Sequence, residues 1–534
     1  EVCMRSPRLI LLWLLAGAFL LVASACAPEP VARHTPAHVS QTPDPARSLA
    51  LPTPLSVSTQ LAPTPSALPG PDAEAPEETL DAAGAAPALR YRVQADLDWT
   101  ARRVAVEEWI DFHNRTGAPL REIVFSVDIN GDPDRFALKR LEAGAGLELH
   151  TYSLDDTRLT VSLPQPLAPE GLLTLRLSYD LAVPPIADGY RFGHLGYLGY
   201  SDRQLNLGNW LPLVAHHDPV RGWICPLPHT VGEHAARPLA DFDVTLRVKG
   251  MPEGLSAVAP GAASGGKGEW RFELTGAREM TISLSDRYEV QRATAPSGAE
   301  VVLYTFAEPG RSPDAAQHAL QTATNALGLF EKLFDQPYRH ERLIVVEGDF
   351  PDGMEFSGLV FVSKDWFRAW QGVPNDWLTL ITAHEVAHQW WYSVVGSDQG
   401  NSPYLDEALA IYSELLYFER FLPEHVAWWW DFRVGAYGPS GFVDSPVYDF
   451  HSPRAYINAI YLQGARMMQS LREDLGDLAF FGWLQRYANQ MQGQLATPYD
   501  FWGALTGDEY AATLETRKRY LRNANVLARS SDLP

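Results

Sequence analysis

Two short segments constrain the fold of this chain more than any other feature of its sequence. Residues 384–388 read H-E-V-A-H, and Glu407 follows the second histidine after eighteen intervening residues. On an α-helix, residues four apart stand one above the other on one face. His384 and His388 can therefore contact a single ion, with Glu385 beside them as a base. The pentapeptide predicts a buried helix that carries a metal site.

The residues around Glu407 supply the rest of such a site. Pro403 precedes it and apolar residues at helical spacing follow, so Glu407 is expected near the start of a second amphipathic helix. Zinc held by three protein ligands keeps a fourth position open for water, which is typical of catalytic sites. We expect one Zn²⁺ per chain, bound by His384, His388 and Glu407. Glu385 would be the general base that moves a proton from the zinc-activated water to the leaving group.

A third motif lies upstream, where residues 352–361 read D-G-M-E-F-S-G-L-V-F. It is similar to the G-x-M-E-N segment of the aminopeptidase N family of gluzincin zinc metallopeptidases, and the whole order of motifs resembles that family. The resemblance implies that Glu355, with Gly353 and Met354, binds the free amino terminus of a peptide substrate. Phe356 stands where the family usually has Asn.

A fourth motif lies downstream, where residues 456–464 read Y-I-N-A-I-Y-L-Q-G. It is similar to the family's Y-x-K-G segment, with Gln463 at the usual Lys. The resemblance implies that Tyr461 donates a hydrogen bond to the developing oxyanion. The sequence gives no confident match for the family's second amine-binding residue, usually a Glu or Gln of the amino-terminal domain.

These motifs predict a zinc metallopeptidase, an aminopeptidase that removes N-terminal residues from peptides by attack of zinc-activated water. Two alternatives stay open. One is an endopeptidase or a peptidase of narrow specificity, and the other is a surface-tethered binding protein whose catalytic fold is vestigial. The net charge of −22 argues against nucleic acid as a partner. The sequence gives no indication of oligomeric state.

The order of apolar patterns predicts an α+β multidomain fold. Short alternating segments across residues 89–295 indicate an antiparallel β sandwich or saddle. Residues 296–534 are expected to form the catalytic domain, which the resemblance makes thermolysin-like, with mixed α/β structure first and helices after Glu407. Helices are expected at about 312–334, 405–421, 456–474, 477–491 and 498–525.

Several residues allow two interpretations. Glu414 could accept a hydrogen bond from a ligand histidine or be an exposed helix carboxylate. Tyr456 could support the site or pack in the core. The tryptophans at 428–430 are expected in the core rather than in a cleft. Four histidines in the β region match no ligand spacing, so we expect no second metal site there: His216, His217, His229 and His234.

The amino terminus has the pattern of a targeting segment. Basic residues, an apolar stretch at 9–22 and a small-residue run ending in Cys26 predict a signal peptide over residues 1–26 with a lipobox-like end. Cys26 would then be lipidated, although ordinary secretory cleavage is the alternative. The Pro/Ala/Thr-rich residues 27–88 predict a disordered tether. We expect export across the cytoplasmic membrane and anchoring at the cell surface as a lipoprotein, through the lipid or the signal segment.

Overall fold

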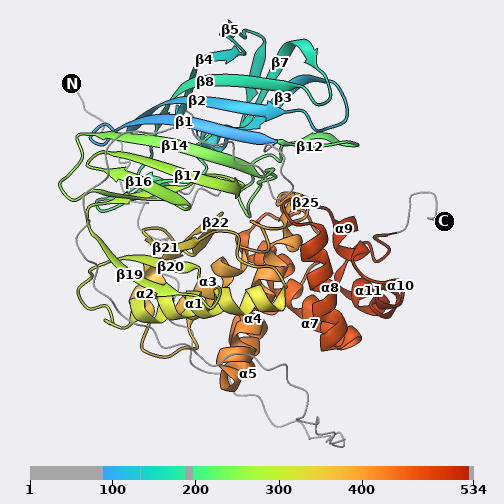
Figure 1. Ribbon diagram of the computed structural model, residues 1–534. Coiled ribbons are helices and arrows are strands. Elements are labelled where there is room, and N and C mark those ends of the chain that lie inside the picture. The colour runs from blue at the N-terminus through green and yellow to red at the C-terminus, as the bar shows by residue number, and fades with distance from the viewer. Residues whose placement is uncertain (1–87, 133, 187–195, 528–534) are drawn as a thin grey trace, which may run out of the picture. The chain divides into compact units, whose positions relative to one another are not determined.

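The computed structural model describes residues 88–132, 134–186 and 196–527, all within the unit Pro54–Pro534. The predicted signal peptide, Cys26 and nearly all of the predicted tether lie outside the described residues. Within the described part, no helix combines the length and the apolar character that crossing a membrane requires. The fold is a mixed α+β one, with strands first and helices toward the carboxyl end, as predicted (Figure 1).

The first part is built around an eight-stranded sheet. Its strands alternate buried and exposed residues, as along β1, where Tyr91, Val93 and Ala95 face the core. All neighbours in the sheet pair antiparallel except β1 and β14, which are parallel. In sheet order the strands are β16 (Ala262–Gly266), β17 (Glu269–Ala277), β14 (Ala240–Lys249), β1 (Leu89–Asp98), β2 (Arg103–His113), β8 (Leu172–Ala182), β4 (Phe136–Ala143) and β5 (Leu147–Glu148).

Smaller sheets complete the β-rich part. One four-stranded sheet contains β11 (Leu213–Val214), β3 (Leu120–Ser126), β7 (Arg158–Leu167) and β6 (Tyr152–Asp155). Another contains β15 (Ser256–Val258), β18 (Ile282–Ser285), β10 (Leu205–Leu207) and β9 (Leu198–Tyr200). A short hairpin is formed by β12 (His216–Asp218) and β13 (Gly222–Ile224), and a 3-10 turn, η1 (Asp128–Gly131), follows β3.

A five-stranded mixed sheet opens the second part. Its order is β19 (Tyr288–Thr294), β20 (Glu300–Phe306), β21 (Arg342–Gly348), β23 (Leu359–Ser363) and β22 (Gly353–Phe356). Successive residues of its strands belong to different apolar clusters. Val345 packs with the helices, for example, whereas Val346 packs with the β-rich part. Burial of both faces explains why these strands are apolar throughout. β19, which ends at the predicted boundary near residue 295, pairs with β20 and so belongs to this sheet.

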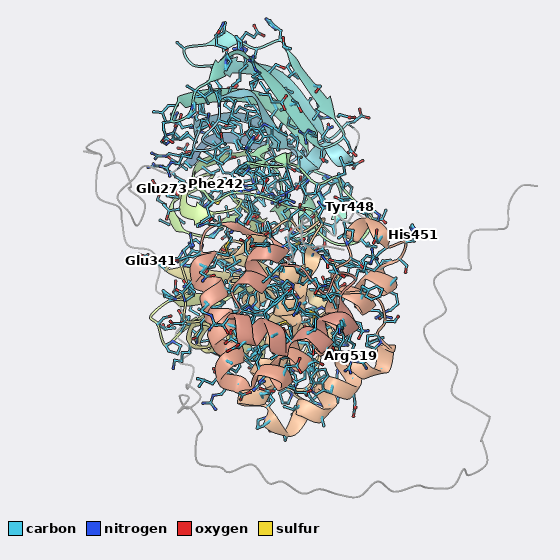
Figure 2. All side chains as sticks on the ribbon, turned by 90° about the vertical axis from the view of Figure 1, so that its right-hand side faces the viewer. Phe242, Glu273, Glu341, Tyr448, His451 and Arg519 are labelled. Carbon is cyan, nitrogen blue, oxygen red and sulfur yellow. The ribbon has the colours of Figure 1, made fainter. Side chains whose placement is uncertain are left out.

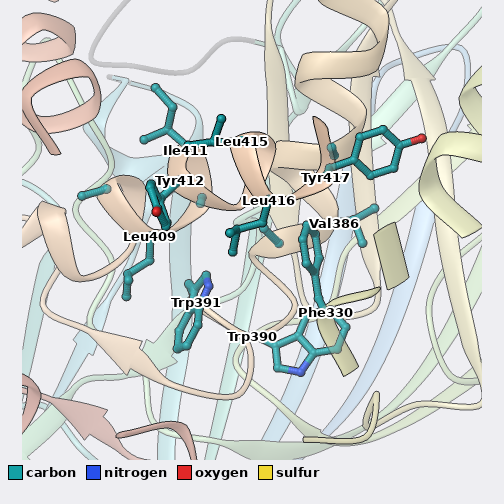
Figure 3. Close-up of a cluster of buried hydrophobic side chains, with 14 of the residues drawn as sticks. Phe330, Val386, Trp390, Trp391, Leu409, Ile411, Tyr412, Leu415, Leu416 and Tyr417 are labelled. Atoms are coloured by element: carbon teal, nitrogen blue, oxygen red, sulfur yellow. The ribbon is translucent and has the colours of Figure 1, made fainter. Parts of the chain in front are cut away.

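Helices α1 and α3 contact this sheet, and α4 packs on α3 (Figure 1). The interior between them includes Phe330, Trp390, Trp391 and Leu416 (Figure 3). The α-helices are α1 (Ala315–Leu333), α2 (Lys364–Ala369), α3 (Trp377–Ala387), α4 (Glu407–Phe421), α5 (Val426–Trp428), α6 (Pro453–Tyr456), α7 (Gln463–Leu475), α8 (Asp477–Gln490), α9 (Pro498–Gly503), α10 (Gly507–Ala512) and α11 (Leu514–Tyr520).

Two predicted helices are interrupted. The one expected at 456–474 contains a π-helical turn, η8 (Ile457–Leu462), between α6 and α7. The one expected at 498–525 is three short helices, and the side chain of Thr506 caps the start of α10 by accepting from the backbone N–H of Glu509. The remaining short turns are η3 (Pro403–Leu405), η4 (Pro423–His425), η5 (Trp429–Val434), η6 (Gly435–Tyr437) and η7 (Val447–Asp449), and a minor sheet pairs β24 (Gly396–Ser397) with β25 (Leu495–Ala496).

Hydrogen bonds join the β-rich part to the helical part. The Arg278 side chain, 2% exposed, donates to backbone carbonyls of Tyr392, Val394 and Gln494. Tyr448, labelled in Figure 2, donates to the carbonyl of Leu227 at 3.1 Å. The loop after β13 is therefore held against the residues that surround the predicted site.

Candidate active site

Helix α3 brings the two histidines of the H-E-V-A-H segment together. It begins at the predicted N-cap, Asp376, whose side chain accepts from the backbone N–H of Thr379 at 3.2 Å. The rings of His384 and His388 lie with centroids 4.8 Å apart on one face. Helix α4, packed on α3, carries Glu407 to them.

The three predicted ligands converge. Glu407 Oε2 lies 3.2 Å from Nε2 of His384 and 3.6 Å from Nε2 of His388. Tetrahedral zinc with bonds of about 2.0–2.1 Å separates its donor atoms by roughly 3.3–3.4 Å. Two imidazole nitrogens and one carboxylate oxygen at these spacings therefore fit zinc, with room for a fourth ligand.

The opposite ring nitrogens are held by acceptors. Nδ1 of His384 lies 2.9 Å from Glu414 Oε1, and Nδ1 of His388 lies 2.5 Å from Asp406 Oδ1. Glu414 is fully buried and is itself held by Arg433 through two hydrogen bonds of 2.9 and 2.8 Å. Protons on both Nδ1 atoms leave the Nε2 lone pairs for the metal. Of the two interpretations of Glu414, the structure supports the one in which it orients a ligand.

Glu385 lies beside this cluster with one oxygen unpaired. Its side chain is buried, and Oε2 has no hydrogen-bond partner among the described residues. Burial raises the pKa of Glu385 to about 7, although the nearby His384 and His388 act to lower it. A carboxylate with a pKa near neutrality suits a base that first accepts and then returns a proton.

Tyr461 reaches the same space from η8. Its ring is stacked on that of His384 with centroids 5.9 Å apart, and its hydroxyl is close enough to Glu407 to help lower the pKa of that buried carboxylate. Gly464 of α7 lets this helix approach α4, because a Cβ at Gly464 would lie 2.5 Å from the Cβ of Ala408. The π-helical turn η8 changes the rotation of the helix just before Gly464. Such π-helical turns are frequent at functional sites. Burial raises the pKa of Tyr461 well above its usual value, so its hydroxyl stays a donor.

Strand β22 presents Gly353, Met354 and Glu355 at the edge of the five-stranded sheet. It pairs with β23 on one side only, and its other edge is free of strand pairing in the described sheet. Gly353 lies against Glu385, where a Cβ would sit 2.6 Å from the carboxyl carbon. The departure at Phe356 has a structural reason, since its ring packs against Tyr197 in the β-rich core.

Sequence reasoning missed two residues of this site. Glu233, in the loop after β13, lies close enough to Glu355 and Glu407 that burial and their charges raise its pKa well above normal. Gln399, before η3, donates hydrogen bonds to both Glu355 and Asp406. Neither has a local sequence signal, because both lie in irregular segments far along the chain from the residues they contact.

The other open residues resolve as follows. Tyr456 is buried, and its ring lies edge-on to Tyr461 with centroids 5.6 Å apart. Trp429 is buried in the core and donates to Glu414, while its neighbours Trp428 and Trp430 are partly buried against the same core. Among the described residues, the groups able to hold a metal are the predicted triad and a set that shares His388 with it.

Comparisons with known proteins agree with this geometry. Residues 318–518 match the model of the peptidase family M1 domain. Aminopeptidase M1-A of Oryza sativa subsp. japonica is 26% identical over 232 residues, covering 41% of this chain and 26% of that protein. Aminopeptidase N of Lactococcus lactis subsp. lactis is 25% identical over 280 residues, covering 47% of this chain and 32% of that protein. The matches thus span about a third or less of these relatives' lengths.

Solved structures share the fold over more of the chain. An M1 zinc metallopeptidase from Deinococcus radiodurans superposes with a TM-score of 0.56 at 18% identity, covering 84% of this chain and 95% of that chain. A two-domain M1 zinc metallopeptidase mutant bound to L-arginine gives a TM-score of 0.58 at 18% identity, covering 83% and 96%. The matched segment is thus a peptidase family M1 domain, and the chain is similar to aminopeptidase N and to M1 zinc metallopeptidases.

Proposed function

We propose that this protein is a zinc aminopeptidase that holds one Zn²⁺ per chain. The observation that carries the proposal is the convergence of two histidine nitrogens and the Glu407 carboxylate next to a buried carboxylate, Glu385, with an unpaired oxygen. When bound there, zinc supplies Lewis-acid polarisation of the scissile carbonyl and of water.

The residues of the chain account for the proton transfers. Glu385 accepts a proton from the attacking water and returns it to the leaving amine, because its raised pKa makes both transfers accessible near neutral pH. Tyr461, held beside His384 and Glu407, donates its O–H to the oxygen on which negative charge develops. The free edge of β22 can pair with an extended peptide backbone.

A surplus of carboxylates favours a substrate with a free amino terminus. Glu355 and Glu233 line one pocket together with Gln399 and Met354. Burial raises the pKa of Glu355 well above normal, with Asp406 and Glu407 adding to the effect against the opposing charge of His388. An α-ammonium placed between Glu355 and Glu233 would offset part of their negative charge and gain charge-assisted hydrogen bonds. Glu233 is thus our candidate for the second amine-binding residue.

Two structural neighbours support a peptide substrate. One M1 zinc metallopeptidase from Deinococcus radiodurans is described as bound to a Tyr-Ser-Ala substrate, and a two-domain member as bound to L-arginine. A tripeptide and a single amino acid are the kinds of ligand that a site closed around a peptide's amino end would accept.

The deciding experiment compares peptides with free and with acetylated amino termini. The zinc-loaded protein should release residues one at a time from free peptides and spare acetylated ones. Glu355→Gln and Glu233→Gln should each lower kcat/KM for free peptides by about tenfold or more, which is the loss of one charge-assisted contact. Glu300→Gln is the control and should keep parental turnover, because Glu300 lies on β20 of the five-stranded sheet, away from β22 and Glu355. Equal cleavage of both peptide classes would indicate an endopeptidase, and no cleavage would indicate a binding protein.

We also propose that the protein is exported and anchored by lipid on Cys26. The support comes from the sequence alone, namely the apolar stretch at 9–22, the small residues before Cys26 and the tether-like composition of 27–88. Expressed in a bacterium, the chain should fractionate with membranes and incorporate labelled fatty acid. Cys26→Ser should remove the label, and a mature chain that begins elsewhere would contradict the proposal.

A further inference from the structure

Gln399 occupies a position between the predicted amine site and the metal site. Its side chain is 3% exposed. Its Nε2 donates to Glu355 Oε1 at 3.1 Å and to Asp406 Oδ2 at 2.6 Å. Glu355 comes from β22 and Asp406 directly precedes α4, so one amide group contacts two elements that carry the site.

The orientation of this amide is fixed by a third partner. The backbone N–H of Ala235 donates to Oε1 of Gln399 at 3.2 Å, and the backbone N–H of Gln399 donates to the carbonyl of Ala235 at 3.0 Å. With its oxygen committed to Ala235, the amide must turn its two N–H groups toward the carboxylates. The amide oxygen and both N–H groups of the side chain are thus used.

The second carboxylate leads directly to a predicted zinc ligand. Asp406 accepts from Gln399 on Oδ2 and contacts Nδ1 of His388 on Oδ1 at 2.5 Å. The contacts run from Glu355 through Gln399 and Asp406 to His388 without a gap. Glu355 and Asp406 are also both acidic groups, and burial first and Asp406 in addition raise the pKa of Glu355. The amide gives each of them a donor and so permits both to stay close in a buried site.

We propose that Gln399 is a positioning residue that couples recognition of the substrate's amino terminus to the orientation of the zinc ligand His388. Through Glu355 it fixes the carboxylate that meets the α-ammonium. Through Asp406 it fixes the proton and the ring orientation of His388. The amine-recognition half of this inference rests on the proposed aminopeptidase function, whereas the metal half does not.

The first test replaces the amide with a side chain of similar length that has no N–H donor. Gln399→Met should weaken zinc binding by about 10-fold or more, which is the range for losing an outer contact to a ligand. It should also raise KM for free-amine peptides and lower the ratio of kcat/KM for free over acetylated peptides by about tenfold. Zinc affinity is measured by chelator competition on the whole chain.

The matched control is Gln336→Met. Gln336 is also buried, at 4% exposed. Its side chain donates a hydrogen bond of 2.6 Å to Asn489, which is not a residue of the site. This variant should keep parental zinc affinity and parental amine preference. If Gln399→Met matched the control in both measurements, the coupling role would be overturned. A parent protein that cleaves both peptide classes equally would remove the aminopeptidase proposal instead, and zinc affinity would still test the metal half.

A second pair of variants keeps the test decisive if Gln399→Met does not fold. Gln399→Glu sets an acceptor against Asp406, and Asp406→Asn sets a donor against the Gln399 amide, so each alone should weaken zinc binding. In the double variant the two changes restore one donor–acceptor contact. We expect it to bind zinc more tightly than the sum of the single losses in binding free energy predicts, while its preference for free amines stays low. Additive losses in zinc affinity would contradict direct contact between the two side chains.

Discussion

At the scale of single residues, the site is defined by what the ligand histidines do with their second nitrogens. Glu414 and Asp406 each hold one Nδ1 atom, and Arg433 in turn holds Glu414. Buried carboxylates thus orient both histidines. Glu385, by contrast, has an oxygen with no hydrogen-bond partner among the described residues. Metal binding and proton transfer are therefore assigned to different side chains.

This division predicts that zinc binding and hydrolysis separate by mutation. Glu385→Gln should retain about one zinc per chain, because Glu385 is no ligand, and lose turnover by about 10²- to 10⁴-fold, the usual range for general acid–base catalysis. His388→Ala should lose both. Metal analysis and peptide hydrolysis measure the two properties, and parental turnover in Glu385→Gln would show that another group is the base.

Tyr461 should contribute only where charge develops on the substrate. Tyr461→Phe removes the O–H and keeps the ring against His384. We expect kcat to fall by about 10²- to 10³-fold with KM little changed, since the hydrogen bond forms in the transition state. Steady-state kinetics measure both constants. A variant that changed KM alone would place the hydroxyl in substrate binding instead.

At the scale of elements, the site depends on the close approach of β22 to α3. Gly353 lies where any Cβ would collide with the Glu385 carboxyl group, and no left-handed backbone is involved. The lack of a side chain at Gly353 therefore lets β22, the strand that would bind the peptide, lie against α3, the helix that carries the base.

Gly353→Ala should displace Glu385 while the zinc ligands stay in place. We expect zinc content to stay near parental and kcat to fall by about tenfold or more, because small misplacements of a reacting group are costly. Gly507→Ala is the control, since a Cβ at Gly507 meets nothing within 4 Å. Equal kinetics of the two variants would show that Glu385 can shift without loss.

The packing of α1 on α3 should make stability depend on pH. His318 of α1 lies 2.7 Å from the hydroxyl of Thr379 and stacks on Trp370 with centroids 5.0 Å apart, and burial lowers its pKa to about 4. An unfolded histidine has a pKa of about 6.5, so between about 6.5 and 4 the unfolded chain binds more protons. The unfolding free energy should fall as the pH falls through this window.

His318→Gln keeps a polar group opposite Thr379 and removes this titration. Its melting temperature should therefore fall less than that of the parent between pH 7 and pH 4. Thermal unfolding of both proteins across that range gives the comparison. Parallel curves would mean that His318 takes up its proton in the folded state.

At the scale of the whole molecule, the β-rich part and the helical part are joined by buried polar contacts as well as by apolar packing. Arg278 spans this junction, with Nη1 donating to the carbonyl of Arg237 at 2.6 Å and Nη2 to that of Gln494 at 3.0 Å. Arg237 belongs to the loop that carries Glu233, so the junction also helps to hold the proposed amine site.

Arg278→Met should lower the free energy of unfolding by about 3 kcal/mol or more, because several buried carbonyls lose a charged donor at once. Arg271→Met provides the comparison. Arg271 is 45% exposed in its ion pair with Asp243, and its loss should change stability by less than about 1 kcal/mol. Denaturant unfolding measures both, and similar shifts for the two variants would exclude a special role for the junction.

The sequence by itself was enough to predict the metal triad and its base, because helical spacing is a local property. His384, Glu385 and His388 need only one helix, and its start at Asp376 and the helix opening at Glu407 were also readable from capping and periodicity. The order of β-rich and helical parts followed from local alternation in the same way. The π-helical turn that contains Tyr461 could not be predicted, since it changes the rotation of the helix without changing its apolar pattern.

Only the tertiary structure decided which residues meet at the proposed amine site. Glu233 and Gln399 lie in loops, and their positions follow from how the five-stranded sheet packs between the helices and the β-rich part. The direction of Phe356 into the β-rich core was decided by the same packing. Contacts between residues so far apart in the chain depend on the sum of many buried surfaces. Spacing along the sequence therefore predicted the metal ligands and the base, and tertiary packing decided which other side chains lie beside them.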